Sequence, residues 1–196
     1  MRKILMIISV LLSFTFSATA QMIDPKFGAK AGVNFSEVND SELKGKTGFH
    51  IGLLAEIYLG EQFSVQPEIL YSAQGAKAEE EGYTSKLNLD YISVPLMAKY
   101  YIADGFNIQA GPQFSFLTKA EIKGEIDDLG SATLDIKDEL ESFELGLNFG
   151  LGYELPMGVF FDARYNIGLT KINKESIVGE NDLKNRVFQI GVGYKF

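Results

Sequence analysis

The sequence of 196 residues contains no cysteine, a single histidine and a shortage of positive charge. Without cysteine the chain can form no disulfide, and it lacks the residue that carries a lipid anchor at a processed N-terminus, so its stability must come from the fold. The 18 lysines and arginines are outnumbered by 26 aspartates and glutamates, for a net charge of −8. This acidic balance, without any basic stripe, argues against nucleic acid as a partner.

Long apolar runs are also lacking, except at the N-terminus. Arg2 and Lys3 precede the apolar segment Ile4–Phe16, and Ala18-Thr19-Ala20 then supplies a small-x-small cleavage motif. The run of about 13 residues is too short to cross a bilayer as a helix, so a retained membrane anchor is the less favoured interpretation. This pattern is typical of a secretory signal peptide.

We therefore predict a signal peptide over residues 1–20, cleaved after Ala20, and one exported domain over residues 21–196. Within that domain, apolar residues do not recur with helical spacing over any extended segment. Instead, eight segments alternate apolar and polar residues with period two, which indicates strands with one dry and one wet face. These segments are 27–36, 49–59, 63–73, 87–100, 106–116, 143–153, 159–169 and 188–196.

The fourth of these segments changes phase. Leu87 and Leu89 share one phase, whereas the apolar residues from Ile92 to Tyr100 share the other. We interpret the change near Asp90–Ile92 either as a β-bulge or as the point where the strand leaves the membrane.

The connections between the segments alternate in length. Tight turns are expected at 60–62, 102–105 and 155–158, and long polar loops at 37–47, 74–86, 118–141 and 170–185. Short turns on one side and long loops on the other are typical of outer-membrane barrels, whose termini lie on the periplasmic side. Within 118–141, Ala120, Ile122 and Ile126 suggest that strands continue as a protruding hairpin, whose edge could bind a partner by strand addition.

Alternation alone also fits a soluble, lipocalin-like barrel with its apolar face turned inward. Here, however, the polar face carries full charges and many glycines, and glycine weakens a strand that only has to cover a soluble surface. Aromatic residues also gather at both ends of the apolar face, as in the two interfacial girdles of a membrane barrel. One group is Phe27, Phe63, Tyr100, Phe106, Tyr153, Tyr194 and Phe196, and the other is Phe35, Phe49, Tyr71, Phe116 and Phe143.

The last segment ends on Phe196, with apolar residues at alternating positions behind it. It resembles the C-terminal signal that the barrel-assembly machinery recognises in its clients. Because hydrocarbon offers no hydrogen-bond partner, every strand must be paired on both edges. We therefore predict an all-β fold, an eight-stranded antiparallel up-and-down transmembrane β-barrel with its apolar face outward and strand eight closing on strand one.

Several local patterns resemble the small outer-membrane β-barrel family of Gram-negative bacteria, whose members are often labelled porin-family proteins. They are the segment from Phe27 to Ser36, Tyr91-Ile92-Ser93-Val94-Pro95-Leu96 with Lys99-Tyr100, Ala110-Gly111-Pro112, and Asp162-Ala163-Arg164-Tyr165. The resemblance covers residues 26–196 and implies the barrel fold and an outer-membrane location. It brings no active site that could be transferred to this chain.

Charges of both signs are predicted to face the lumen. The acidic residues are Glu56, Glu68, Glu154 and Asp162, and the basic residues are Lys30, Lys99, Arg164 and Lys195. An eight-stranded barrel is just wide enough to be filled by its own side chains, so we expect these charges to pair and plug the lumen. An open selectivity ring in a narrow channel for small solutes is the alternative.

Other chemistry has weaker support. His50 is predicted to face inward near the extracellular mouth, but no Ser or Asp motif marks partners for catalysis. The acidic residues of 118–141 lack EF-hand spacing, so a solvated loop is favoured over a calcium site. We predict no catalytic, cofactor-binding or metal-binding residue and no enzyme activity.

The expected function is a structural or interaction role. The expected partners are outer-membrane lipid, the barrel-assembly machinery and an extracellular ligand or protein bound by the four long loops.

Overall fold

The computed structural model describes residues 24–38, 44–80, 83–126, 130–173 and 183–196. The predicted signal peptide therefore lies outside the described residues. The described chain forms nine strands and one short 3-10 helix, η2 (Lys137–Glu139). The strands are β1 (Lys26–Val38), β2 (Lys44–Tyr58), β3 (Phe63–Glu80), β4 (Tyr83–Ala103), β5 (Phe106–Ile126), β6 (Gly130–Asp135), β7 (Phe143–Glu154), β8 (Val159–Gly168) and β9 (Asn185–Lys195).

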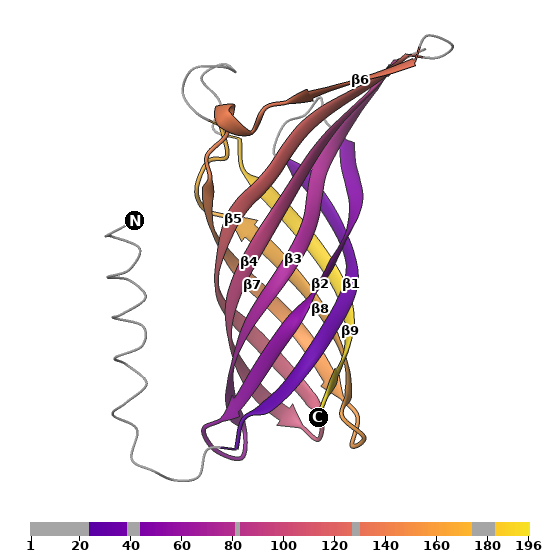
Figure 1. The fold of residues 1–196 in the computed structure, drawn as a ribbon. Coiled ribbons are helices and arrows are strands. Elements are labelled where there is room, and N and C mark those ends of the chain that lie inside the picture. The colour runs from indigo at the N-terminus through magenta and orange to yellow at the C-terminus, as the bar shows by residue number, and fades with distance from the viewer. Residues whose placement is uncertain (1–23, 39–43, 81–82, 127–129, 174–182) are drawn as a thin grey trace.

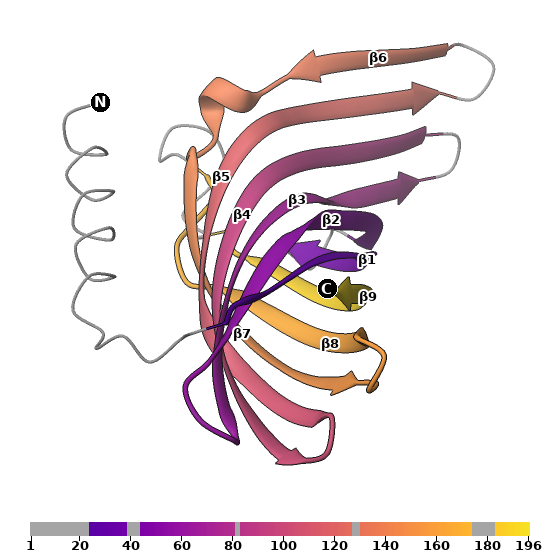
Figure 2. The same cartoon turned by 60° about the horizontal axis from the view of Figure 1, so that its bottom comes forward.

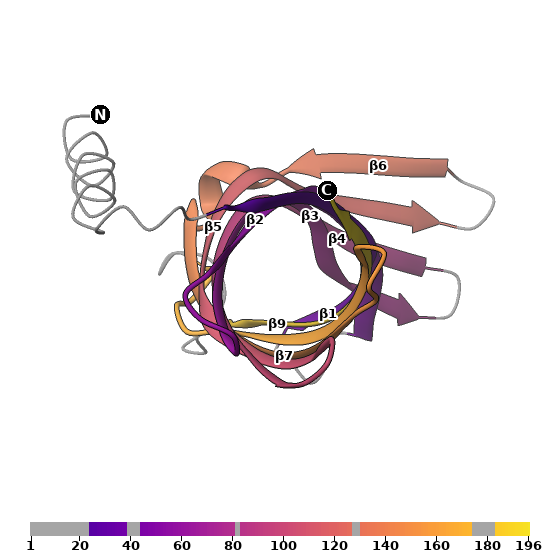
Figure 3. The same cartoon turned by 90° about the horizontal axis from the view of Figure 1, so that it is seen from below.

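Eight of these strands close an antiparallel barrel, as predicted. Each barrel strand pairs with its neighbours in the chain, and β4 pairs with β5. The ring closes between β9 and β1, in register from Gly28 opposite Lys195 to Val38 opposite Asn185. Seen along its axis the barrel is a complete ring (Figure 3). Closure leaves no free edge in the barrel wall.

The predicted orientation of the two faces is confirmed. Along β9, Phe188, Ile190 and Val192 are exposed on the outside, while Gln189 and Gly191 between them are buried inside. Leu53 near the middle of β2 is 65% exposed. Aromatic residues on adjacent strands also contact each other around one rim, in the pairs Phe35–Phe188, Phe49–Tyr71 and Phe116–Phe143. The outer surface is thus an aliphatic band with an aromatic border.

One end of the barrel carries the tight turns and is called here the turn end. The turns lie between β2 and β3, β4 and β5, and β7 and β8, as predicted, and the C-terminus lies at the same end (Figure 1). Gly105 and Gly158 in two of these turns have φ of 73° and 89°, a left-handed conformation that favours glycine. Across the described residues, no helix has the length and apolar character needed to cross a membrane.

The opposite end, the hairpin end, differs from the prediction. The expected loop at 74–86 is wrong, because β3 runs to Glu80 and β4 starts at Tyr83, with pairing from Phe63↔Tyr100 to Glu80↔Tyr83. The protruding hairpin expected in 118–141 is confirmed, with β5 running to Ile126 and pairing with β6. Both hairpins extend well beyond the barrel ring on one side (Figure 2).

The phase change in the fourth segment has a different origin from the expected bulge in that strand. The register shift lies in the partner strand β5, because Asp90 pairs with Lys119 while Tyr91 pairs with Leu117. Thr118 is the extra residue, and its hydroxyl donates a hydrogen bond to the Asp90 carbonyl at 2.8 Å. Leu89 and Tyr91 both face inward, so β4 keeps its phase and its inner face becomes apolar at the hairpin end.

Candidate functional site

The inner face of the barrel is the candidate site, because it gathers almost all of the buried charged side chains. They come from seven strands that the fold places around one lumen: Lys30, Glu56, Glu68, Lys99, Glu144, Asp162, Arg164 and Lys195. All are at most 5% exposed. A buried charge is costly unless it is paired and hydrogen-bonded, so the partners of these groups decide what the lumen can do.

A central ion cluster joins three strands. Arg164 on β8 donates two hydrogen bonds to Glu68 on β3, from Nη1 at 2.8 Å and from Nη2 at 2.6 Å. The same Nη2 lies 3.1 Å from Asp162 Oδ2, and Asp162 also accepts a hydrogen bond from Lys30 on β1. Two cations and two anions therefore neutralise each other inside the barrel. The two-pronged geometry is the strongest that arginine forms with a carboxylate.

A second ion cluster lies toward the turn end, around Glu56 on β2. Its carboxylate receives Lys99 Nζ at 3.1 Å, the Tyr101 hydroxyl at 2.7 Å, and further hydrogen bonds from Lys195 and Ser64. Lys195 Nζ also contacts Glu154 Oε2 at 2.5 Å. Each of the eight charges predicted to face the lumen, Glu154 included, thus has a partner of opposite charge, and these eight form two clusters. The buried Glu144 was not among the predicted pairs.

An uncharged polar layer follows the central cluster toward the hairpin end. Asn34 donates hydrogen bonds to Ser72 at 3.0 Å and to the Ala73 carbonyl at 2.9 Å, and it accepts one from Gln189 at 3.0 Å. His50 Nδ1 lies 2.8 Å from Asn34 Oδ1. This network was missed at the sequence level, where serine, asparagine and glutamine on the inner face carry no signal beyond their phase.

His50 faces inward as predicted, but it lies beside the central ion cluster and not at the mouth. A methyl group added to Gly191 would lie 2.6 Å from Asp162 Oδ1 and 3.2 Å from His50 Nε2, so glycine leaves the space that both side chains fill. Nε2 has no hydrogen-bond partner within the described part of the chain. Among the described residues, the imidazole contacts one amide, which is not the acid–histidine–nucleophile arrangement of a catalytic triad.

The space left between the two ion clusters is small. A cavity of about 10 Å³ is lined by Gln66, Lys99, Asn107, Gln109, Asp162 and Arg164, among others. That volume holds about one water molecule. At the turn end a wider recess of about 300 Å³ is bordered by Tyr58, Tyr101 and Glu154, beside the second ion cluster.

Among the residues that the structure describes, no group of three or more histidines, cysteines, aspartates or glutamates could hold a metal ion. Of the acidic residues proposed for a solvated loop, Glu121 and Asp135 face each other across the β5–β6 pair.

Comparisons with solved structures agree with this geometry. Neisserial surface protein A has a similar fold, with a TM-score of 0.56 and 16% sequence identity, over 87% of this chain and 97% of that one. Ail, the attachment invasion locus protein of Yersinia pestis, has a TM-score of 0.53 and 16% identity, over 89% of this chain and 100% of that one. A search of curated proteins finds no match. At these identities the likeness concerns the fold alone.

The family of the chain is identified by a sequence match to a family model. Residues 8–174 match the family described as "outer membrane protein beta-barrel domain", which covers most of the chain. The match agrees with the exposed apolar band, the closed ring and the polar lumen. The chain therefore belongs to the outer membrane protein β-barrel domain family.

Proposed function

We propose that this protein is an integral outer-membrane barrel whose lumen is plugged by its own charged side chains, and that it has a structural or interaction role. The observation that carries the proposal is the two-pronged pair between Arg164 and Glu68, which links β8 to β3 through the interior. The cluster also links β1 to β8, because Lys30 donates a hydrogen bond to Asp162. A diffusing solute would have to displace these groups.

The energetics favour a closed state. Separating a buried ion pair leaves an uncompensated charge, at a cost of about 3–5 kcal/mol when one partner is removed. The central cluster and the Glu56 cluster would each have to open along the same path. Because both clusters contain both signs of charge, neither cations nor anions find a continuous row of favourable sites. Transport through a narrow channel is therefore the less favoured function.

The hairpin end supports the interaction role. The two protruding hairpins place β6 at the outer edge of the sheet, where β6 pairs with β5 on one side (Figure 2). No other described strand pairs with β6. Such an edge is a template for strand addition by a partner chain. With the turn end in the periplasm, these hairpins face the outside of the cell.

A liposome-swelling assay tests the closed lumen. We expect liposomes that contain the wild-type protein to swell in small sugars no faster than protein-free liposomes. The triple variant Arg164→Ser/Glu68→Ser/Glu56→Ser, which removes the central pair and the carboxylate of the second cluster, should swell faster and shows that the assay detects an opened barrel. Swelling of the wild type at the rate of the variant would overturn the plug and support the channel.

Orientation and processing have separate tests. Since the chain has no native cysteine, Ala132→Cys on β6 and Gly60→Cys in a tight turn each introduce one unique thiol. On intact cells an impermeant maleimide should label the first and not the second, and the reverse result would invert the orientation. Export with cleavage after Ala20 requires that the intact mass of the purified protein corresponds to a chain that starts at Gln21.

A further inference from the structure

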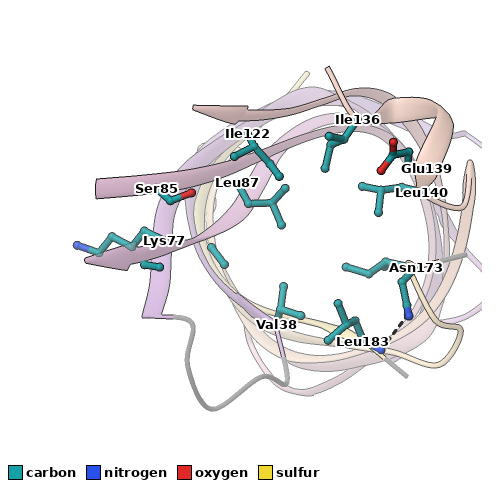
Figure 4. A pocket seen from close by; sticks show the side chains of 13 residues that line it. Val38, Lys77, Ser85, Leu87, Ile122, Ile136, Glu139, Leu140, Asn173 and Leu183 are labelled. Atoms are coloured by element: carbon teal, nitrogen blue, oxygen red, sulfur yellow. Dashed lines mark hydrogen bonds between the residues drawn. The ribbon is translucent and has the colours of Figure 1, made fainter. Parts of the chain in front are cut away.

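The mouth of the barrel at the hairpin end contains an apolar cavity. Its volume is about 230 Å³, and in Figure 4 the lining side chains converge on an open centre. Aliphatic residues predominate in the lining: Val38, Ala76, Ala78, Leu87, Ile122, Ile136, Leu140, Ile172 and Leu183. This composition contrasts with the ion-paired lumen beyond it, and neither the plug nor the strand edge explains it.

The cavity is a consequence of local changes in the two strands that form its wall. The extra residue Thr118 reverses the phase of β5, so that Ala120 is buried inside and Ile122 lines the cavity. Leu87 on β4 points to the same space (Figure 4). Without the bulge, the apolar side chains of β5 would stay on the outside. The fold thus directs apolar groups inward where the rest of the inner face is polar.

The floor and the rim are already formed. Leu89, Tyr91, Leu117 and Ala120 pack below the cavity in one buried cluster and are at most 5% exposed. At the rim, backbone hydrogen bonds of 2.9 Å join Glu141 to Ile172 and Ile172 to Leu183. A site with a fixed floor and rim loses little conformational entropy when a ligand enters.

Two of the four polar residues in the lining are directed away from the centre of the cavity or bonded at its rim. The Asn173 side chain accepts a hydrogen bond from the Leu183 N–H at 3.0 Å, and the Lys77 ammonium points away from the centre (Figure 4). A cavity whose wall is mostly aliphatic holds water poorly. An apolar cavity of about 150 Å³ stays dry and binds benzene, so this larger one fits a somewhat larger apolar group.

We propose that this cavity binds an aliphatic hydrocarbon group, either the end of a lipid acyl chain or a small neutral apolar molecule. The ion clusters below the floor stop such a ligand from crossing the lumen, because it could not replace their hydrogen bonds. The ligand therefore enters and leaves by the hairpin end, and the site is one of binding and not of transport. The inference goes beyond the proposed function and holds whether or not ions pass the lumen.

Methyl NMR of the protein in lipid nanodiscs tests the site, with 13C-labelled leucine and isoleucine and 1-octanol as the probe. We expect saturable shifts at Leu87, Ile122 and Ile172. Lipid-facing Leu53 and Ile69 should show only the gradual, unsaturated change that comes from partitioning into the bilayer. If a lipid acyl chain is the resident ligand, the cavity methyls show NOEs to protonated acyl chains before the probe is added, and these vanish with deuterated lipid.

A matched pair of variants locates the binding. Ala78→Phe fills the cavity, whereas Ala132→Phe adds the same group to an exposed position on β6. Displacing the contacts of about two methylenes should weaken octanol binding by about tenfold in the first variant and leave it unchanged in the second. The proposal is overturned if the wild type shows neither saturable shifts nor lipid NOEs. It is also overturned if both variants bind the probe like the wild type. The wild-type titration decides the matter even if Ala78→Phe does not fold.

Discussion

Arg164 and Glu68 are 96 residues apart in the sequence, yet two hydrogen bonds of 2.8 and 2.6 Å join them across the interior of the barrel. Both side chains are at most 1% exposed. The pair links β8 directly to β3, although these two strands are not neighbours in the sheet. Several measurable consequences follow from this relationship and from the layers around it.

Removing one member of the pair should be strongly destabilising. Arg164→Met leaves Glu68 without its main partner, at a cost of about 3–5 kcal/mol in the free energy of unfolding. The double variant Arg164→Met/Glu68→Met should be closer to the wild type, because it leaves neither an unpaired arginine nor an unpaired glutamate. Urea unfolding in lipid vesicles measures both. Lys119→Ala, which breaks an exposed pair with Glu121, is the control and should change little. An Arg164→Met variant as stable as the control would contradict the pairing.

A charge introduced on the outer face should lower the free energy of unfolding more when it lies deeper in the bilayer. Leu53→Arg near the middle of β2 is expected to cost about 2–4 kcal/mol, because the guanidinium would lie in hydrocarbon. Leu59→Arg, beside the turn that follows β2, should cost about 0–1 kcal/mol because it can reach the interface. Both leucines are more than half exposed to the barrel's surroundings, at 65% and 59%. Equal costs in vesicle unfolding would argue against the outward apolar band.

Gly191 should not accept a larger residue. In Gly191→Ala the new methyl would lie 2.6 Å from Asp162 Oδ1, so the central ion cluster must shift, at a cost of about 1–3 kcal/mol. Gly60→Ala is the matched control, since nothing lies within 4 Å of its added methyl. Their unfolding free energies should therefore differ in this direction. If the two variants unfold alike, the tight contact between Gly191 and the cluster is wrong.

Deleting Thr118 should reverse the face on which the hairpin end of β5 presents its residues. Ala120 is fully buried, so a thiol at Ala120→Cys should react slowly with a water-soluble maleimide. When Thr118 is also deleted, the register shift is lost and position 120 turns outward. The reaction rate should then rise. An unchanged rate would mean that the bulge does not set the apolar lining of the mouth.

The sequence predicts the barrel well where the membrane and the turns constrain it. The strands from Phe106 and Phe143 begin where the alternation begins, because lipid on one side and a polar lumen on the other enforce period two. Above the membrane that constraint disappears. Residues 74–80 are therefore polar enough to suggest a loop, although they continue β3 through backbone pairing with β4.

The lumen could be predicted in kind but not in detail. Phase alone shows that Glu68 and Arg164 face inward, and a narrow barrel requires such charges to pair. Which charges meet depends on the stagger of strands that are not neighbours, which no local pattern encodes. The sequence indicated the apolar mouth only through Leu87 and Leu89, which lie on the same face of their strand. Its interpretation required the bulge at Thr118, which lies in the partner strand.

Single-channel recording in planar bilayers tests the central claim, a lumen closed by ion pairs, most directly. We expect no steady conductance steps from the wild-type protein. We expect steps to appear when Arg164→Ser and Glu68→Ser remove the central pair together with Glu56→Ser in the second cluster. Steady, large steps from the wild type, unchanged in this variant, would contradict the claim and make the protein a channel.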